Sequence, residues 1–250
     1  MNLITVTPQN AHKESLFCIK DTKSNAFQKK LNWFEGRVKE GLILKIMKNE
    51  EDKPIAFIEY CPVEYAWRPV MGNNFMFIQC MFVYSNKDRL QGAGSMLIKD
   101  CEETARSLGM DGVCTISSKG SWIHNKLLFE KNGYEQIDKV GRFELMLKKF
   151  NNEAEDPKLI DWTQKPSDFK GWHLIYADQC PWHEKSVQAI SKVCSENGIK
   201  INVKRLESAE QTQNAPSGFG TFALIYNGKL LEDHYLSETR FRNILGEIKN

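Results

Sequence analysis

The sequence contains no apolar run that approaches the roughly 18 residues needed to span a membrane. Its first residues, MNLITVTPQNAHKES, lack the charged segment and following apolar segment of a secretory signal. Lysine and arginine total 34, and aspartate and glutamate total 32, so the net charge of +2 predicts no basic surface for nucleic acid or an anionic membrane. We therefore expect a cytoplasmic protein without a nucleic-acid or membrane partner.

The seven cysteines are odd in number and include no C-x-x-C pair. This pattern argues against both a disulfide framework and a zinc knuckle, so we expect no bound metal and mostly small, buried thiols. With 41% hydrophobic and 26% charged residues, the 250-residue chain has the composition of a globular protein of one large or two modest domains.

Apolar spacing predicts an α/β protein. Residues 25–39 place Phe27, Leu31 and Phe34 at helical spacing, and residues 75–83 (FMFIQCMFV) are apolar on both faces, which is typical of a central strand. Further strands are expected at residues 3–7, 42–48, 55–61, 111–117 and 143–150, and further helices after residue 94 and at residues 125–135.

A change of composition predicts a second unit. Residues 151–170 are polar, contain two prolines and read as a linker, partly packed through Leu159, Ile160 and Trp162. Beyond them we expect a strand from Trp172, a helix after residue 180, strands at residues 201–206 and 221–231, and a closing helix from Ser237. The predicted organisation is thus a domain at 1–150, a linker at 151–170 and a smaller domain at 171–250.

The segment RLQGAGSML, residues 89–97, joins the central strand to a helix. Glycines at such a junction let backbone N–H groups approach phosphate oxygens at a helix N-terminus. The alternative is a plain connection in which glycine only supplies a positive φ. Leu97 excludes the dinucleotide fingerprint, and the absence of a following Gly-Lys-Ser/Thr excludes a P-loop.

RLQGAG matches the Q/R-x-x-G-x-G/A signature of the GCN5-related N-acetyltransferases, and LLFEKNGY, residues 127–134, resembles their second landmark. The predicted order of elements over residues 1–150 also resembles that superfamily. The resemblance implies the acyl-CoA N-acyltransferase fold, with a mixed, splayed central sheet, and acetyl-CoA as co-substrate. The residues it implies for the cofactor are Met81, Phe82 and Val83 for the pantetheine, Arg89, Leu90, Gln91, Gly92, Ala93, Gly94 and Ser95 for the pyrophosphate, and Asn125, which could equally be a helix N-cap.

Acetyl transfer requires a neutral amine, and a general base contributes about 10²–10⁴ in rate. Glu59 and Glu64 are the candidate bases, although either could be a solvated carboxylate. Phe129 stands where the superfamily commonly has a proton-donating tyrosine, so either Ser121 or His124 replaces it or the thiolate leaves unaided. We expect His124 at the surface. The residues expected to line an acceptor pocket are Tyr60, Tyr65, Trp67, Arg68 and Trp122.

The segment DQCPWHEK, residues 178–185, resembles the active-site corner of a thioredoxin-like domain. Cys180 at a helix start should favour the thiolate, and a protonated His183 should add to this effect. His183 replaces the second cysteine, so no internal bridge can form there. An acetyltransferase domain followed by such a domain resembles the YoaP-like acetyltransferases.

Two functions follow from these resemblances. The first is an N-acetyltransferase that moves acetyl from acetyl-CoA to a small-molecule amine by direct attack, with Glu59, Glu64 and Cys180 as candidate catalytic residues. The second is a CoA-binding, thiol-dependent redox or binding module centred on Cys180, without acetyl transfer. The sequence leaves a homodimer open.

Overall fold

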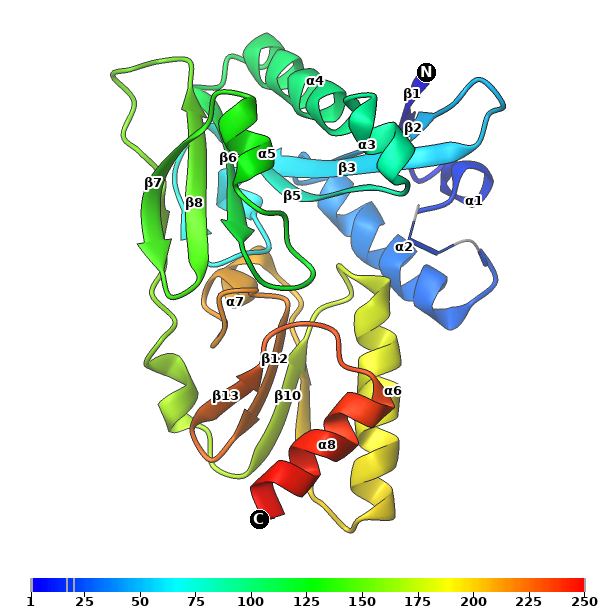
Figure 1. Ribbon diagram of the computed structural model, residues 1–250, viewed down its shortest axis with the longest axis vertical. Coiled ribbons are helices and arrows are strands. Elements are labelled where there is room, and N and C mark those ends of the chain that lie inside the picture. The colour runs from blue at the N-terminus through cyan, green and yellow to red at the C-terminus, as the bar shows by residue number, and fades with distance from the viewer. Residues whose placement is uncertain (1, 17, 20, 250) are drawn as a thin grey trace.

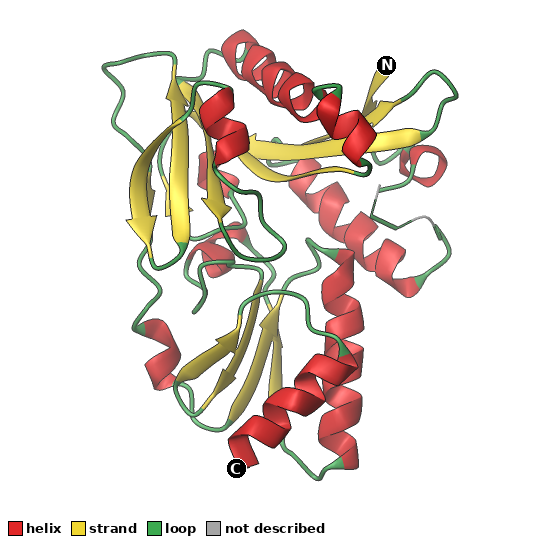
Figure 2. Ribbon diagram, viewed as in Figure 1, coloured by secondary structure: helices red, strands yellow, loops and turns green. Residues whose placement is uncertain are grey.

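The computed structural model describes residues 2–16, 18–19 and 21–249, which form two α/β halves stacked along the long axis (Figures 1 and 2). The N-terminal half is built on a seven-stranded sheet in the order β1-β2-β3-β5-β6-β8-β7. Only β5 and β6 pair in parallel there, so the sheet is mixed, as predicted. The strands are β1 (Asn2–Val6), β2 (Ile43–Lys48), β3 (Pro54–Pro62), β5 (Phe75–Val83), β6 (Gly112–Ser118), β7 (Glu135–Val140) and β8 (Phe143–Lys149).

Helices cover both faces of this sheet. The helical segments of this half are α1 (Ala11–Glu14), α2 (Asn25–Val38), η1 (Val63–Tyr65), α3 (Asn86–Leu90), α4 (Ala93–Ser107) and α5 (Leu127–Lys131). On one face, α2 starts at Ser24, whose side chain accepts the Phe27 N–H, and it buries Phe27, Leu31 and Phe34 as the helical spacing predicted. On the other face α4 packs on β3 and β5 (Figure 1). Successive residues of β3 therefore alternate between the α2 face and the α4 face.

The second half has a four-stranded sheet in the order β11-β10-β12-β13, with β10 and β11 parallel and the other pairs antiparallel. Its elements are β10 (Trp172–Tyr176), α6 (Pro181–Glu196), β11 (Ile201–Arg205), α7 (Ala209–Gln213), β12 (Phe222–Tyr226), β13 (Lys229–Glu232) and α8 (Glu238–Lys249). The expected single strand at 221–231 is wrong. Asn227 and Gly228 have φ of 45° and 81°, so the chain turns there into a hairpin, as an Asn-Gly pair favours.

The segment between the halves is packed against both. It contains β9 (Lys158–Leu159), which pairs with β4 (Val70–Met71), and η2 (Lys165–Asp168). Leu159 and Trp162 are buried as expected, and the Trp162 ring meets Phe143 edge-on with centroids 5.2 Å apart. One hydrophobic cluster contains residues of α2, β2 and β3 together with Ile175 and Ala223 of the second half. The two halves therefore share their cores.

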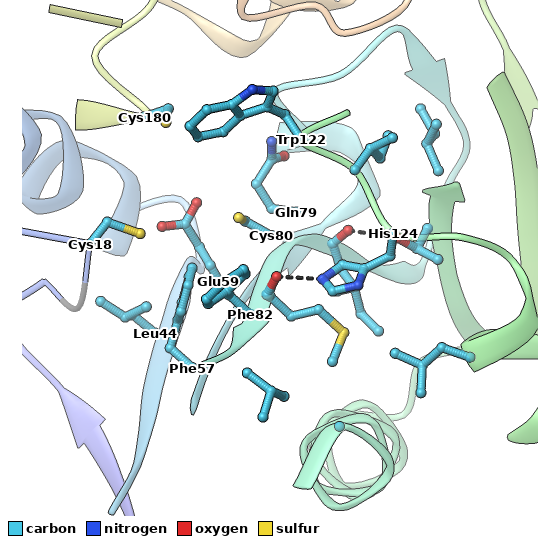
Figure 3. Close-up of a pocket in the computed structure, with 18 of the residues that line it drawn as sticks. Cys18, Leu44, Phe57, Glu59, Gln79, Cys80, Phe82, Trp122, His124 and Cys180 are labelled. Atoms are coloured by element: carbon cyan, nitrogen blue, oxygen red, sulfur yellow. Dashed lines mark hydrogen bonds between the residues drawn. The ribbon is translucent and has the colours of Figure 1, made fainter. Parts of the chain in front are cut away.

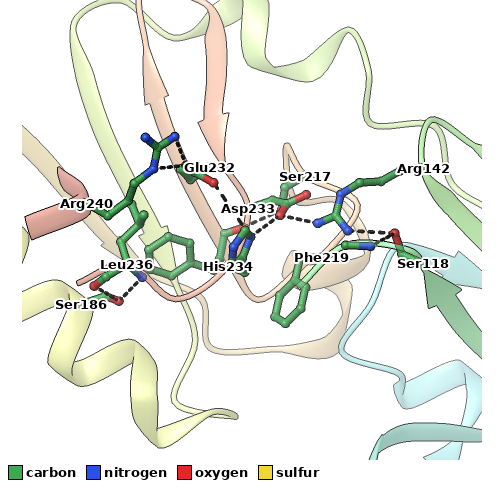
Figure 4. A network of polar contacts seen from close by, with 12 residues as sticks. Ser118, Arg142, Ser186, Ser217, Phe219, Glu232, Asp233, His234, Leu236 and Arg240 are labelled. Atoms are coloured by element: carbon green, nitrogen blue, oxygen red, sulfur yellow. Dashed lines mark hydrogen bonds and ion pairs between the residues drawn. The ribbon is translucent and has the colours of Figure 1, made fainter. Parts of the chain in front are cut away.

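A polar network also joins the halves. Arg142, at the β7–β8 turn, lies 2.6 Å from Asp233, which is 2.9 Å from His234 Nδ1 (Figure 4).

Within the ranges described, no helix is both long and apolar enough to cross a membrane.

Candidate functional site

A cavity of about 950 Å³ opens between the central strands, the start of α4 and the second half of the chain (Figure 3). Five of the cavity-lining residues come from the second half: Gln179, Cys180, Pro181, Trp182 and Phe219. The cavity-lining residues also include eleven predicted for the cofactor, the acceptor or catalysis, namely Glu59, Arg68, Met81, Phe82, Val83, Arg89, Gly92, Gly94, Ser95, Trp122 and Asn125.

The glycine turn forms one end of this cavity. Gly92 is the N-cap of α4 with φ of 80°, a left-handed conformation that favours glycine. The N–H groups of Gln91 and Gly92 are already bonded to the carbonyls of Lys87 and Arg89, at 3.1 and 3.0 Å. The first N–H groups of a helix have no acceptor within it, so those of Ala93, Gly94 and Ser95 are the ones open to an anion.

Only some of the residues predicted to bind the pyrophosphate line the cavity. Gly92, Gly94, Ser95 and Arg89 line the cavity, whereas the exposed Gln91 and the buried Ala93 contribute no lining side chain. The side chain of Leu90 lies outside the described part of the chain.

The central strands separate next to the turn. β5 pairs with β6 only from Phe75–Gly112 to Ile78–Thr115, and from there β6 continues along β8 while β5 continues along β3. The β5 edge that faces β6 is therefore unpaired beyond Ile78. The predicted splayed sheet is present, and Met81, Phe82 and Val83 lie on the diverging part of β5.

His124 occupies part of that open edge. It is half-buried, so its expected place at the surface is wrong, and its Nε2–H donates to the Met81 carbonyl over 2.5 Å (Figure 3). Burial lowers its pKa, so the ring is neutral near pH 7 and its one N–H is engaged. Ser121, the other candidate for the tyrosine's role, lines a different, smaller cavity. Phe129 is buried against Tyr134 and has no proton to donate.

Asn125 lines the cavity just before α5. Its Oδ1 accepts the N–H of Leu127 over 3.1 Å, while Lys126 is the N-cap residue and makes no side-chain capping bond. Asn125 therefore stabilises the helix start from one position further out than a true N-cap, and its amide NH₂ has no bond within the described chain.

Glu59 is the buried carboxylate of the cavity. Its Oε2 is 2.6 Å from Lys30 Nζ, and its Oε1 accepts from Gln179 Nε2 over 2.8 Å. Lys30 in turn lies over the Trp33 ring, 4.0 Å from its centroid. The prediction that Glu59 is only a solvated strand carboxylate is therefore wrong.

Tyr60 faces away from the cavity, so its assignment to the acceptor pocket is wrong. Successive residues of a strand point to opposite faces, so Tyr60 must leave the face that Glu59 occupies. Its hydroxyl lies 3.3 Å from Asp100 and 3.1 Å from Thr104, both on α4. Burial raises the pKa of Tyr60 well above its ordinary value.

Three other expected site residues lie elsewhere. Glu64 sits in η1, where its Oε1 accepts the Asn74 N–H over 2.7 Å, and Tyr65 is exposed beside it. Trp67 is buried edge-on against Trp33, with centroids 5.2 Å apart. None of the three lines the cavity.

Trp122 and Arg68 do line it. Trp122 has φ of 66° and packs against Trp182 and Tyr235, with centroids 5.9 and 5.0 Å apart, so an aromatic cluster spans the two halves. Arg68 is buried and donates to the carbonyl of Phe219.

Cys180 stands at the N-cap of α6, before Pro181, as predicted. Burial raises its pKa, and this outweighs the Trp182 N–H and the cations Lys30 and Arg68, which act the other way. His183 cannot assist, because its burial lowers its pKa to about 3 and its Nδ1–H donates to the Ala177 carbonyl. The surroundings of Cys180 therefore disfavour the expected thiolate.

Cys18 and Cys80 also line the cavity, and burial raises the pKa of both, that of Cys80 to about 12 (Figure 3). All seven cysteines are described and free, and four of them are buried: Cys61, Cys101, Cys114 and Cys194. No His/Cys/Asp/Glu group within the described chain has the arrangement of a metal site.

The sequence reasoning missed several lining residues: Cys18, Lys30, Gln79, Cys80, Gln179, Trp182 and Phe219. Only Lys30 had a usable signal. It is a polar residue three positions after Phe27 and one before Leu31, on the buried side of α2, and a buried cation requires a partner.

Comparison with known proteins gives one relative that matches almost the whole chain and one family model that matches part of its second half. Residues 200–243 match the model of a family described as YoaP-like. The chain is 27% identical over 254 residues to a Bacillus subtilis (strain 168) protein described as uncharacterized N-acetyltransferase YoaP, covering 99% of this chain and 100% of that protein.

Similar solved structures cover about three fifths of the chain. The ribosomal-protein-alanine N-acetyltransferase from Brucella melitensis is 19% identical, covers 60% of this chain and 100% of its own, and has a TM-score of 0.43. The GNAT family N-acetyltransferase YhbS from Escherichia coli, solved in complex with CoA, is 13% identical, covers 63% and 88%, and has a TM-score of 0.41.

Proposed function

We propose that this chain is an acetyl-CoA-dependent N-acetyltransferase that acetylates a small amine in the cavity between its two halves. One observation carries the proposal: the splayed β5 edge and the glycine-capped start of α4 open into the same cavity as the buried Glu59. The end-to-end likeness to a relative described as an N-acetyltransferase supports the same activity.

The cavity's charges suit an anionic co-substrate at the α4 end. Arg89 lines it there and Lys131 lies nearby on α5, both exposed, while the N–H groups of Ala93, Gly94 and Ser95 add the positive end of α4. These groups would hold the phosphates of acetyl-CoA. The β5 edge at Met81–Val83 would face the pantetheine arm and offer it backbone N–H groups, because the Met81 and Val83 carbonyls already accept from His124 and Arg89.

The reaction is direct transfer. The amine nitrogen attacks the thioester carbonyl, a C–N bond forms, the C–S bond breaks and CoA leaves as the thiolate. The amine gives up one proton, which passes to solvent, so the products are an amide, the CoA thiolate and a proton. Glu59 is the group proposed to accept the amine's proton, directly or through water, because it is the carboxylate among the described lining residues. No side chain is assigned to the thiolate, because Phe129 has no proton and the His124 N–H is engaged. A thiolate is a good leaving group, so it departs unaided.

The second half completes the acceptor end. Its sheet order, its parallel β10–β11 pair and Cys180 at the start of α6 are what a thioredoxin-like unit would have, which supports that relationship. Gln179 holds Glu59, and Trp182 and Phe219 cover the acceptor side, so this unit serves as a wall of the pocket. The alternative redox function centred on Cys180 loses its main support, because the thiol's pKa is raised.

Thiol release from acetyl-CoA, followed with a chromogenic disulfide reagent across a panel of small amines, tests the proposal. Amine-dependent release and an acetylated product of the expected mass support it. Acetyl-CoA binding without release for any amine contradicts it.

A further inference from the structure

Arg68 is a buried cation without a carboxylate partner. Its side chain is 5% exposed and lies over the Phe219 ring, 3.9 Å from the centroid, with one N–H given to the Phe219 carbonyl. Within the described chain no aspartate or glutamate forms an ion pair with it, and its remaining N–H groups are not sealed off, since Arg68 lines the cavity.

The charges around Arg68 do not balance. Lys30 and Glu59 neutralise each other at 2.6 Å, and Asp233, the other carboxylate whose charge acts on Arg68, is paired with Arg142 at 2.6 Å. Arg68 therefore leaves this end of the cavity with one positive charge in excess. Burying an unpaired cation is costly, and arginine does not escape the cost by losing its proton. A guanidinium fork matches the two oxygens of a carboxylate, which makes an organic carboxylate the fitting counter-ion.

We propose that the acceptor is a small amine that also carries a carboxylate, and that Arg68 binds this carboxylate while the amine faces Glu59. The inference rests on the proposed acetyltransferase function and adds the class of acceptor. The CoA phosphates are not the anion in question, because Arg68 lies among Glu59, Cys80 and Cys180, whereas Arg89 and the glycine turn form the other end. The aromatic cover of Trp122, Trp182 and Phe219 favours a compact molecule.

The test compares acids with their amides on the wild-type protein. The twenty common L-amino acids, β-alanine and γ-aminobutyrate are each assayed beside the corresponding primary amide. Removing the carboxylate makes the amine easier to deprotonate, so chemistry alone would favour the amides. We expect at least one acid to exceed its amide in kcat/KM by about 10- to 100-fold, the range for losing one charge-assisted hydrogen-bonded contact. Equal or better turnover of every amide overturns the inference.

Variants then assign the effect to Arg68. In Arg68→Met the KM for the preferred acid should rise about 10- to 100-fold while its amide is unaffected, and Arg68→Lys should fall between, because it keeps the charge and loses the fork. Arg37→Met is the matched control, since Arg37 also joins the halves, through the Glu207 carbonyl, but does not line this cavity. A loss of acid selectivity in Arg37→Met as large as in Arg68→Met contradicts recognition by Arg68.

Binding separates this inference from the function on which it rests. Calorimetry of the same acids and amides with CoA-loaded protein needs no turnover. Acids that bind while nothing is acetylated would contradict the acetyltransferase and support the anion site. If amines are acetylated but neither binding nor turnover distinguishes acid from amide, the acetyltransferase function is supported and the carboxylate site at Arg68 is contradicted.

Discussion

The Gln179 side chain donates to Oε1 of Glu59 over 2.8 Å, although the two residues lie 120 positions apart and in different halves of the chain. Lys30 holds the other oxygen at 2.6 Å. The carboxylate is thus fixed by α2 on one side and by the turn before α6 on the other. A change in the second half can therefore alter the chemistry of the first.

Replacing Glu59 by Gln should reduce turnover per folded molecule by about 10²-fold or more, as expected for loss of a general base. Steady-state thiol release measures this, with acetyl-CoA binding as a check on the site. Glu64→Gln is the control, because Glu64 is exposed and outside the cavity, and it should leave turnover unchanged. A Glu59→Gln variant as active as the wild type would remove Glu59 from the mechanism.

The same substitution should cost stability. It leaves Lys30 buried without its carboxylate, and breaking a buried pair in this way destabilises by about 3–5 kcal/mol. Urea denaturation measures the loss. The double variant Lys30→Met/Glu59→Gln removes the orphaned charge and should recover part of it. No recovery would mean that the pair contributes mainly through packing.

Gly94→Val should weaken acetyl-CoA binding and preserve the fold. A Cβ at Gly94 would lie in van der Waals contact with Leu128, 3.5 Å away, so the fold tolerates it, while the two methyl groups of valine add bulk at a cavity-lining position beside the N–H groups proposed for the phosphates. Loss of even one charge-assisted hydrogen bond weakens binding by about 10- to 100-fold. Calorimetry gives the affinity and circular dichroism the fold. Gly36→Val, in α2 with open space around it, should bind normally.

Cys180 should be alkylated more slowly near pH 7 than a free thiol. Only the thiolate reacts, and burial raises the pKa, so the rate should climb at a pH above that of an unperturbed cysteine. Iodoacetamide labelling against pH, read by peptide mass spectrometry, tests this with the urea-unfolded protein as reference. Faster labelling in the folded protein than in the unfolded chain would contradict this prediction and support an activated Cys180 thiol.

His183 should make the fold sensitive to acid. Its pKa is about 3 when folded and about 6.5 when unfolded, so the unfolded chain binds more protons between these values. Its contribution is complete above pH 6.5 and falls by up to about 1.4 kcal/mol per pH unit as pH drops toward 3. His183→Asn, which keeps a donor for the Ala177 carbonyl, should flatten the pH dependence of urea unfolding between pH 6.5 and 4. An unchanged slope would contradict the buried neutral ring.

Local patterns determined much of this protein in advance. The spacing of Phe27, Leu31 and Phe34 gave α2, the apolar run 75–83 gave the central β5, and Gly92 between strand and helix gave the turn, because each depends on neighbours within a few residues. The Asn227-Gly228 pair is also a local pattern, and it could have predicted the hairpin between β12 and β13. The edge strand β7 could not be predicted in this way, because its mostly polar sequence shows no alternating apolar face.

Only the tertiary structure decided the chemistry of the site. Glu59 and Tyr60 are adjacent, and which of them faces the cavity depends on the register of β3 and on what packs against each face. The protonation of Cys180 follows from burial under segments remote in the sequence, which overrides the helix dipole that the local pattern predicts. The excess charge of Arg68 likewise exists only because folding pairs Lys30 with Glu59 and leaves Arg68 without a carboxylate partner among the residues that the structure describes.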